Sequence, residues 1–319
     1  MIILRLLLFY FSFSCFVLGS DSLSIGFWNI ENLFDLENDP SIRDDEFAIG
    51  GKKNVTRDIY ELKIERSVEV LTDLNVDILG LCEVENISVL IELNNSYKGR
   101  DYKIIHFDSP DVRGIDNALL YDQNKFSVLV SKAIENKLGG DEKTRDILYV
   151  KGSFLDVTLH IFVNHWPSNY GGKERAIPKR KLTAELLMNQ IKTIQKNDKF
   201  AEIILIGDFN EDPNDDNVRM LEKLGFINQM LPMMGESGMG TYVYRGKDYF
   251  YDQIIISEGL NTYQGLHVSD ESIFILDKPK YRQHDGKYKH YPFRFWAGNN
   301  LLGGYSDHLA TKIVLRKMK

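Results

Sequence analysis

The stretch EIILIGDFNEDP, residues 202–213, has four consecutive apolar residues followed, after one glycine, by a polar segment that contains Asp208 and Asn210. A short and fully apolar run of this kind is typical of a buried strand. Chemically active side chains stand in a similar position, at an end of an apolar run, at Asn29, Glu83, Asn164, His165, Asp252, Asp307 and His308. Because strand ends at one edge of a packed sheet converge in space, we expect these side chains to form a single site.

Strand-like segments outnumber helical ones and are spread over the whole chain. Their expected ranges are 22–29, 76–82, 102–107, 118–121, 126–130, 147–154, 159–164, 202–206, 250–257 and 309–315. Helices are expected at 61–75, 179–194 and 216–224, and no internal repeat or Pro/Gly-rich linker divides the chain. We therefore expect one α+β domain over residues 20–319, a four-layer α/β/β/α sandwich of two packed mixed sheets flanked by helices, in preference to a doubly wound parallel sheet.

The first twenty residues differ from the rest because they are almost wholly apolar or aromatic. Arg5 is the only charge before Asp21. We expect residues 1–19 to be a cleaved secretory signal peptide, which predicts a secreted or periplasmic protein with no integral membrane segment in the mature chain. A membrane anchor and a lipoprotein attached at Cys15 are the alternatives, but the apolar run is short for a bilayer span and the residues before Cys15 fit a lipobox poorly.

The charge balance limits the ways in which the protein can bind a polyanion. The formal net charge of −7 becomes −8 when Arg5 leaves with the signal peptide. This excludes a globally basic nucleic-acid-binding protein, so a polyanion must be bound by a local basic patch. Only Cys82 remains after cleavage, which rules out an intramolecular disulfide and leaves the fold to its apolar core.

Carboxylate, amide and imidazole side chains gathered in one site are the groups that phosphodiester cleavage requires. Oxygen ligands hold Mg²⁺ or Mn²⁺ with waters retained. The metal offsets charge on the phosphoryl oxygens, while imidazoles and carboxylates transfer protons. A serine triad at residues 306–308 is the competing interpretation, but the chain has no GxSxG nucleophile elbow.

Seven segments support this chemistry. They are FWNIENLFD (27–35), LCEVEN (81–86), RGIDNALLYD (113–122), NHWPSNYGG (164–172), IGDFNEDP (206–213), YDQIIIS (251–257) and GYSDHLA (304–310). In this order they resemble the signature motifs of the endonuclease/exonuclease/phosphatase superfamily, in particular its exported bacterial members. The resemblance spans nearly the whole mature chain, and it implies a divalent-metal-dependent phosphodiesterase with a deoxyribonuclease-like fold.

The resemblance also implies a role for each matching residue. Glu83 would be the principal metal ligand, with Asn29 and Asp307 completing or steering the shell around Mg²⁺ or Mn²⁺. Asp208 and Asn210 would orient the attacking water and a phosphate oxygen.

Two histidine–carboxylate pairs are implied as well. His308 would pair with Asp252 and His165 with Asp116, so that each carboxylate fixes the tautomer of its imidazole. Which histidine is the base and which the acid stays open. The expected phosphate or substrate contacts are Arg145, Asn164, Arg175, Lys280 and Arg282.

The distribution of charge favours nucleic acid as the substrate. Residues 278–294 (KPKYRQHDGKYKHYPFR) hold six Lys or Arg against one Asp, with aromatic residues interleaved, and a second basic stretch covers 173–181. Basic side chains for phosphates and aromatic rings for stacking suit a nucleic acid strand. We therefore expect a secreted nuclease, most simply an endonuclease, that acts on DNA or RNA as a monomer, with no protein partner indicated.

Two alternatives stay open. Glu85 stands where the pancreatic-type deoxyribonucleases have an arginine that enters the minor groove, which argues against groove binding of their kind. A phosphatase or phospholipase C-type phosphodiesterase acting on inositol phosphates or phospholipids is the first alternative, and residues 230–239 are the one candidate for its apolar membrane-docking hairpin. A non-catalytic binding module is the remote alternative, because every metal-binding and histidine position is retained.

Overall fold

The computed structural model describes residues 21–236, 238–262, 265–269 and 272–317. The signal peptide expected at residues 1–19 lies outside these ranges. Within them, no helix is both long enough and apolar enough to cross a membrane.

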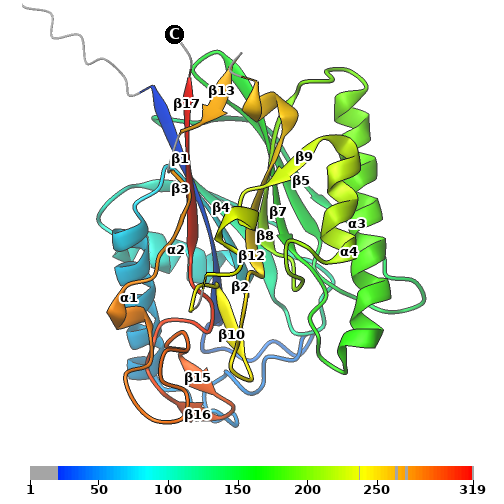
Figure 1. Cartoon of the computed structure of the whole chain (residues 1–319). Helices are drawn as coiled ribbons and strands as arrows, with labels where there is room; N and C mark the ends of the chain where they lie inside the picture. The colour runs from blue at the N-terminus through cyan, green and yellow to red at the C-terminus, as the bar shows by residue number, and fades with distance from the viewer. Residues whose placement is uncertain (1–20, 237, 263–264, 270–271, 318–319) are drawn as a thin grey trace, which may run out of the picture.

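Two large sheets form the centre of the molecule (Figure 1). The first has the order β13 (Leu266–Val268), β17 (Thr311–Lys317), β1 (Ser22–Leu33), β2 (Ile78–Val84), β4 (Asp116–Asp122) and β3 (Tyr102–His106), with β14 (Phe274–Ile275) also pairing with β17. The second has the order β5 (Ser127–Ile134), β6 (Ile147–Phe154), β7 (Val157–His165), β8 (Glu202–Asp208), β12 (Asp252–Ser257) and β9 (Phe226–Asn228). Both sheets are mixed, because β1 and β2 are parallel, as are β7 and β8, among antiparallel neighbours.

Helices cover the outer face of each sheet, which gives four layers (Figure 1). On the first sheet lie α1 (Arg57–Leu74) and α2 (Ile87–Ser96), and on the second lie α3 (Lys173–Gln195) and α4 (Asp216–Arg219). The short 3₁₀ helices are η1 (Met220–Leu224), η2 (Leu231–Met233), η3 (Glu258–Asn261) and η4 (Pro279–Tyr281). Two small hairpins complete the described elements, β10 (Tyr242–Tyr244) with β11 (Lys247–Tyr249) and β15 (Trp296–Ala297) with β16 (Asn300–Leu301).

Strand side chains alternate between a central core and an outer core, as the two-residue period of a strand requires. In β1, Ile25 and Phe27 pack between the sheets, whereas Trp28 belongs to the core beneath α1 and α2. In β8, Ile206 lies in the central core and Leu205 in the core beneath α3. Every one of these five side chains is at most 1% exposed, so both sheets are buried on both faces at the centre of the molecule.

The two sheets approach closely at Gly80 of β2. A Cβ atom added there would lie 2.7 Å from Cδ1 of Ile206, which belongs to the opposite sheet. The absence of a side chain at this position therefore lets the sheets pack at the observed separation.

The strand register brings the expected site residues to one edge of the sandwich. The parallel strands β7 and β8 end at His165 and Asp208, which are directly paired. The antiparallel strand β12 begins at Asp252, opposite Asp208. In the other sheet, Asn29 of β1 and Glu83 of β2 lie where the parallel pairing of these two strands shifts register, near their carboxyl ends.

The expected α+β sandwich is confirmed, with all ten expected strands present, the strand at 147–154 at the expected bounds and the other nine at shifted ones. Helix α2 was not expected, although Asn86 caps it by accepting hydrogen bonds from the amides of Ser88 and Val89. Helix α3 begins at Lys173 and continues through Pro178, where the sequence had suggested a start after the proline.

Candidate active site

Asp208 lies at the centre of the candidate site. Its Oδ2 atom accepts a hydrogen bond from Asn29 Nδ2 at 3.1 Å, which joins the two sheets. The same oxygen lies 3.8 Å from His165 Nε2 and 3.9 Å from His308 Nε2. Burial raises the pKa of Asp208 and the charge of His308 lowers it, and the resulting pKa is about 6. The carboxylate therefore stands between two imidazoles, with a pKa close to neutrality.

His308 forms the expected pair with Asp252. Its Nδ1 atom lies 2.7 Å from Asp252 Oδ2, and both side chains are buried. Burial lowers the pKa of His308, but the charges of Asp252 and Asp208 outweigh burial and raise the pKa well above its ordinary value. The ring of Tyr242 stacks against the imidazole with centroids 4.7 Å apart.

Ser306 supports the loop that carries His308 and does not contact its imidazole ring. Its hydroxyl donates to the carbonyl of Asn29 at 2.7 Å and accepts from the amide of His308 at 3.0 Å. These contacts are backbone contacts, which removes the serine-triad interpretation.

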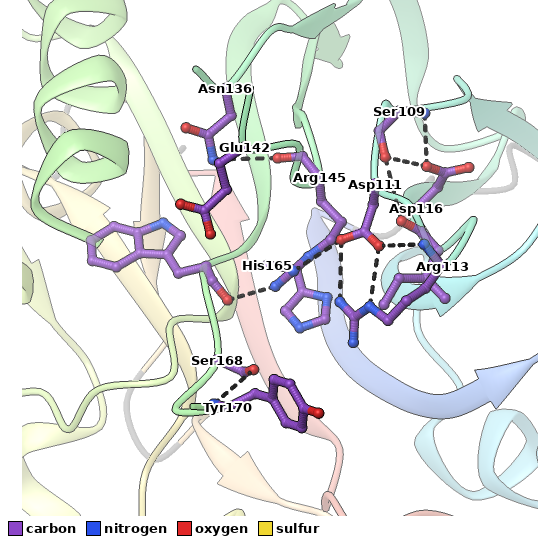
Figure 2. A network of polar contacts seen from close by, with 12 residues as sticks. Ser109, Asp111, Arg113, Asp116, Asn136, Glu142, Arg145, His165, Ser168 and Tyr170 are labelled. Carbon is purple, nitrogen blue, oxygen red and sulfur yellow. Dashed lines mark hydrogen bonds and ion pairs between the residues drawn. The ribbon is translucent and has the colours of Figure 1, made fainter. Parts of the chain in front are cut away.

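The expected pairing of His165 with Asp116 is wrong. Asp116 lies 3.0 Å from His106 Nε2 and accepts a hydrogen bond from the Ser109 amide at 2.8 Å, and Figure 2 shows it turned toward Ser109. Both partners belong to the first sheet or its adjoining loop, because β3 and β4 are direct neighbours. His165 Nδ1 is instead buried without a partner among the described residues.

The surroundings of His165 keep its imidazole neutral. Burial lowers its pKa well below the ordinary value, and the charges of Arg145, Arg113 and His308 lower it further. Asp208 is the carboxylate that its Nε2 atom approaches. The two histidines of the site are thus in opposite electrostatic settings.

Asn210 and Glu83 are held in place by an unusual backbone. Both adopt positive φ angles, 51° for Asn210 and 62° for Glu83. The amide of Asn210 donates to Asp208 Oδ1 at 2.9 Å, and its side chain donates to the carbonyl of Trp166 at 3.1 Å. Glu83 Oε2 accepts from the amide of Asn32 at 3.1 Å. Asn210 therefore contacts the central carboxylate directly, and the backbone of β1 fixes the carboxylate of Glu83.

Glu31 is a buried carboxylate that the sequence interpretation did not select. It accepts hydrogen bonds from the amides of Phe295 and Trp296 at 2.6 and 3.0 Å. Burial, and after it the charge of Asp307, raise its pKa to about 7. Its position two residues after Asn29, within the quoted segment 27–35, was the available signal.

Arg145 is almost wholly buried and faces other protein groups, and its expected phosphate contact stays a prediction. Its guanidinium contacts Asp111 Oδ2 at 3.2 Å and the carbonyl of Trp166 at 2.7 Å, and the residue is 4% exposed (Figure 2). Arg113 also binds Asp111, through both of its carboxylate oxygens, but 44% of its side chain is exposed. Arg113 also interacts electrostatically with Glu83. It is therefore the available cation on this side of the site, and the sequence interpretation had overlooked it.

Three other expected phosphate contacts are directed elsewhere. Asn164 is fully buried. Its side-chain amide donates to the carbonyls of Phe162 and Ile206, and its side-chain oxygen accepts from the Trp166 indole. Lys280 binds Glu69 and Asp73 of α1, and Arg282 binds Asp277. These contacts pair the polar groups of the three side chains with other protein groups, so the geometry gives no support to their predicted substrate contacts, which stay predictions.

Arg175 lies exposed in the first turn of α3. Within the described parts of the chain, its side chain makes no hydrogen bond or ion pair, and its role stays a prediction. Glu85, which had argued against groove binding, accepts from the Asp35 amide at 2.6 Å and is 6% exposed. It therefore holds a neighbouring loop and is itself largely buried.

The acidic end of the site fits a divalent cation. Asp208, Asp252 and His308 have polar atoms within 4.8 Å of one another, but a protonated His308 has no free nitrogen to bind a metal, so Glu83 and Asp307 are the better candidate ligands. Burial raises the pKa of Glu83, and the charge of Asp307 raises it further. A bound cation relieves this repulsion, and carboxylate oxygens are the donors that Mg²⁺ prefers.

Comparison with known proteins places the chain in one family. A model of the Endonuclease/Exonuclease/phosphatase family matches residues 24–317. Truncated TDP2 from Caenorhabditis elegans is similar in structure, with a TM-score of 0.60 and 18% identity over 92% of this chain and 97% of that chain. D. rerio TDP2 complexed with single strand DNA product has a TM-score of 0.58 and 14% identity over 92% of this chain and 99% of that chain.

An endonuclease/exonuclease/phosphatase family protein from Bacteroides thetaiotaomicron has a TM-score of 0.58 and 16% identity over 93% of this chain and 95% of that chain. No curated protein matches the chain. Identities this low show a shared fold alone, whereas the family model covers nearly the whole described chain. Members of the family are generally hydrolases of phosphodiester or phosphoric ester bonds. This chain belongs to the endonuclease/exonuclease/phosphatase family.

Proposed function

We propose that this protein is an exported, divalent-metal-dependent phosphodiester hydrolase that acts on nucleic acid. The observation that carries the proposal is the position of Asp208, whose Oδ2 lies within 3.9 Å of the Nε2 atoms of both His165 and His308. A phosphate bound beside Asp208 would contact one carboxylate and two imidazoles, where strands of both sheets converge. Its export rests on residues 1–19 and is part of the proposal.

The two histidines take different roles, because their environments drive their pKa values apart. His308, whose pKa is raised well above the ordinary value, is charged and stabilises negative charge on the phosphoryl oxygens. His165, whose pKa is lowered, is neutral and serves as a hydrogen-bonding partner of the phosphate or the leaving group.

Asp208 is assigned to accept the proton of the attacking water. A pKa of about 6 lies near the value that suits a general base at neutral pH. Hydrogen bonds from the Asn29 side chain and the Asn210 amide fix its two oxygens, so that its orientation is set before substrate arrives. Asn210 therefore acts by positioning.

Glu83 is assigned as the principal holder of Mg²⁺ or Mn²⁺, with Asp307 and Asn29 beside it. When bound, the metal supplies charge neutralisation of the phosphoryl oxygens. Arg113, exposed near Glu83, is assigned to grip a non-bridging phosphate oxygen through its fork of donors.

Nucleic acid is the favoured phosphoester for two reasons. The D. rerio relative was solved with a single strand DNA product, and we extend that substrate class to this chain. The candidate membrane-docking segment, residues 230–239, has Met230 fully buried, and its residues 231–233 form η2. Among the described residues of that segment, Leu231 is the one exposed large hydrophobic side chain, at 39%, which is less apolar surface than a membrane-docking element presents.

One panel of substrates tests the proposal. The mature protein is incubated with Mg²⁺ and, separately, plasmid DNA, single-stranded RNA, sphingomyelin and an inositol phosphate. We expect cleavage of nucleic acid that EDTA stops and added Mg²⁺ or Mn²⁺ restores. A rate that is indifferent to EDTA contradicts the metal assignment, and turnover confined to the lipid or the inositol phosphate contradicts the substrate.

A further inference from the structure

A cleft of about 820 Å³ opens beside the candidate site. One wall is the β10–β11 hairpin and the other is residues 283–298, and both lie with β15 and β16 at the same end of the molecule in Figure 1. The amide of Gly246 at the hairpin turn donates to the Tyr291 hydroxyl at 2.5 Å, which ties the two walls together. The volume is within the range of about 300–1,000 Å³ that is usual for ligand cavities.

The inner end of the cleft is the candidate site itself. Asp307 lines the cleft, and so does Tyr242, whose ring stacks on His308. Arg294, which also lines it, binds Asp307 at 2.7 Å. A substrate whose phosphate lies against His308 therefore has this cleft as a path for its adjoining part.

The outer part of the cleft combines exposed aromatic rings with unpaired cations. Tyr244 and Tyr288 are each 50% exposed. Arg245 lies over the ring of Tyr244 at 5.2 Å, and Lys287 lies over the ring of Tyr288 at 5.5 Å. Neither cation has a carboxylate within ion-pair distance among the described residues, so both charges are available to a ligand.

We propose that this cleft binds an unpaired nucleic acid strand continuous with the phosphodiester in the site, an inference that rests on the proposed function. The rings of Tyr244 and Tyr288 stack against bases, and Arg245 and Lys287 contact the backbone phosphates. The faces of bases in a duplex are covered by neighbouring base pairs, so aromatic platforms of this kind select single strands. An inositol phosphate would use the cations but would leave the exposed rings of Tyr244 and Tyr288 without a stacked base.

Only part of the basic segment 278–294 lines the cleft. A lysine of the segment that lies elsewhere therefore serves as a matched control for one that lines it. Lys280 is held by Glu69 at 3.2 Å and by Asp73 at 2.9 Å, both on α1. Lys287 belongs to the same segment but lines the cleft. Removal of either lysine changes the net charge equally, yet only Lys287 faces the proposed strand.

The binding test uses the mature protein in EDTA, so that the strand is not cleaved. Fluorescence anisotropy with a short labelled oligothymidylate gives the Kd and its dependence on salt. We expect Tyr288→Ala to weaken binding roughly 5- to 100-fold, as loss of one stacked base does, and Tyr288→Phe to restore it. Lys287→Ala should reduce the slope of log K against log salt by about 0.7, and Lys280→Ala should leave it unchanged.

The outcomes separate this inference from the proposed function. Cleavage of nucleic acid by the wild type, together with unchanged affinity in both Tyr288→Ala and Lys287→Ala, overturns the cleft assignment alone. Equal loss in Lys280→Ala and Lys287→Ala also overturns it, because bulk charge would then explain binding. No cleavage of any nucleic acid by the wild type with Mg²⁺ refutes the proposed function and the inference with it.

A membrane surface is the competing occupant of aromatic and basic side chains. The same variants are therefore tested for sedimentation with vesicles of anionic phospholipid. Loss of vesicle binding in Tyr288→Ala, with oligothymidylate binding retained, would assign the cleft to lipid and overturn the inference.

Discussion

Asp252→Asn is the most informative change at the candidate site, because it removes a charge while retaining shape. His308 Nδ1 lies 2.7 Å from Asp252 Oδ2 in a buried setting, and Oδ1 is buried without a partner among the described residues. If the amide oxygen faces His308, the NH₂ group takes the place of Oδ1 and finds no acceptor. If the NH₂ group faces His308, it requires the opposite tautomer of the imidazole.

The magnitude follows from these two costs. A buried hydrogen bond to a charged group contributes about 1.5–3 kcal/mol, and an unsatisfied buried donor costs a further amount of similar size. Because some relaxation is available, we expect a net loss of about 2–4 kcal/mol in the transition state, which is about 30- to 1,000-fold in kcat/KM. The assay is steady-state cleavage of the nucleic acid found in the substrate panel, at saturating Mg²⁺, with circular dichroism to verify the fold.

Asp116→Asn is the matched control. Asp116 also lies 3.0 Å from a histidine and is 2% exposed, but its partner is His106, outside the candidate site. We expect activity close to that of the wild type. A folded Asp252→Asn variant with undiminished kcat/KM would refute the assignment of His308, and equal losses in both variants would show that the effect is structural.

Three further predictions concern the metal, pH and packing. Glu83→Ala should abolish activity, or raise the Mg²⁺ concentration for half-maximal rate at least about tenfold; full activity at unchanged Mg²⁺ contradicts its role. Burial raises the pKa of Glu202 from 4.5 to about 7, so the folded chain retains a proton that the unfolded chain releases, and the free energy of unfolding falls as pH rises through this range. In the Glu202→Gln variant this fall in the free energy of unfolding should be smaller by on the order of 1 kcal/mol, a value discounted for the partial exposure of Glu202. Urea titrations of both proteins at two pH values measure the difference. A pH dependence identical to that of the wild type would refute the prediction. Gly80→Ala should lower stability by about 1–3 kcal/mol in thermal melts through contact with Ile206, and an unchanged Tm would mean that the sheets can separate.

The fold was predictable because its signals are local. Apolar runs of four to eight residues identify strands, and their spread along the whole chain favours two sheets over a parallel one. Helix α2 was missed, since its ten residues are short for a periodicity argument. The convergence of Asp208, Asp252 and His308 was also predictable, because Asp208 ends β8, Asp252 begins β12 and His308 lies shortly before β17.

Side-chain partners were less predictable, because they depend on register and on the face of the sheet. Asp116 and His165 both lie at strand ends, yet they belong to different sheets, and Asp116 binds His106 in its own sheet. The direction of Lys280 depends on the acidic face of α1, which lies about two hundred residues earlier in the chain. Such long-range pairs leave no periodic pattern in the sequence.

The backbone of the site was beyond sequence reasoning for a different reason. Glu31, Asn32, Glu83 and Asn210 adopt φ angles of 57°, 56°, 62° and 51°, in the region that favours glycine. Such conformations cost of order 1–3 kcal/mol each when other residues adopt them. Here the irregularity of β1 at residues 31 and 32 brings the Asn32 amide to Glu83 Oε2, and the bend at Asn210 brings its amide to Asp208 Oδ1. Glycine would relieve the strain at Glu83 and Asn210 but remove the carboxylate and the carboxamide, so the strain is tied to the presentation of these groups at the site.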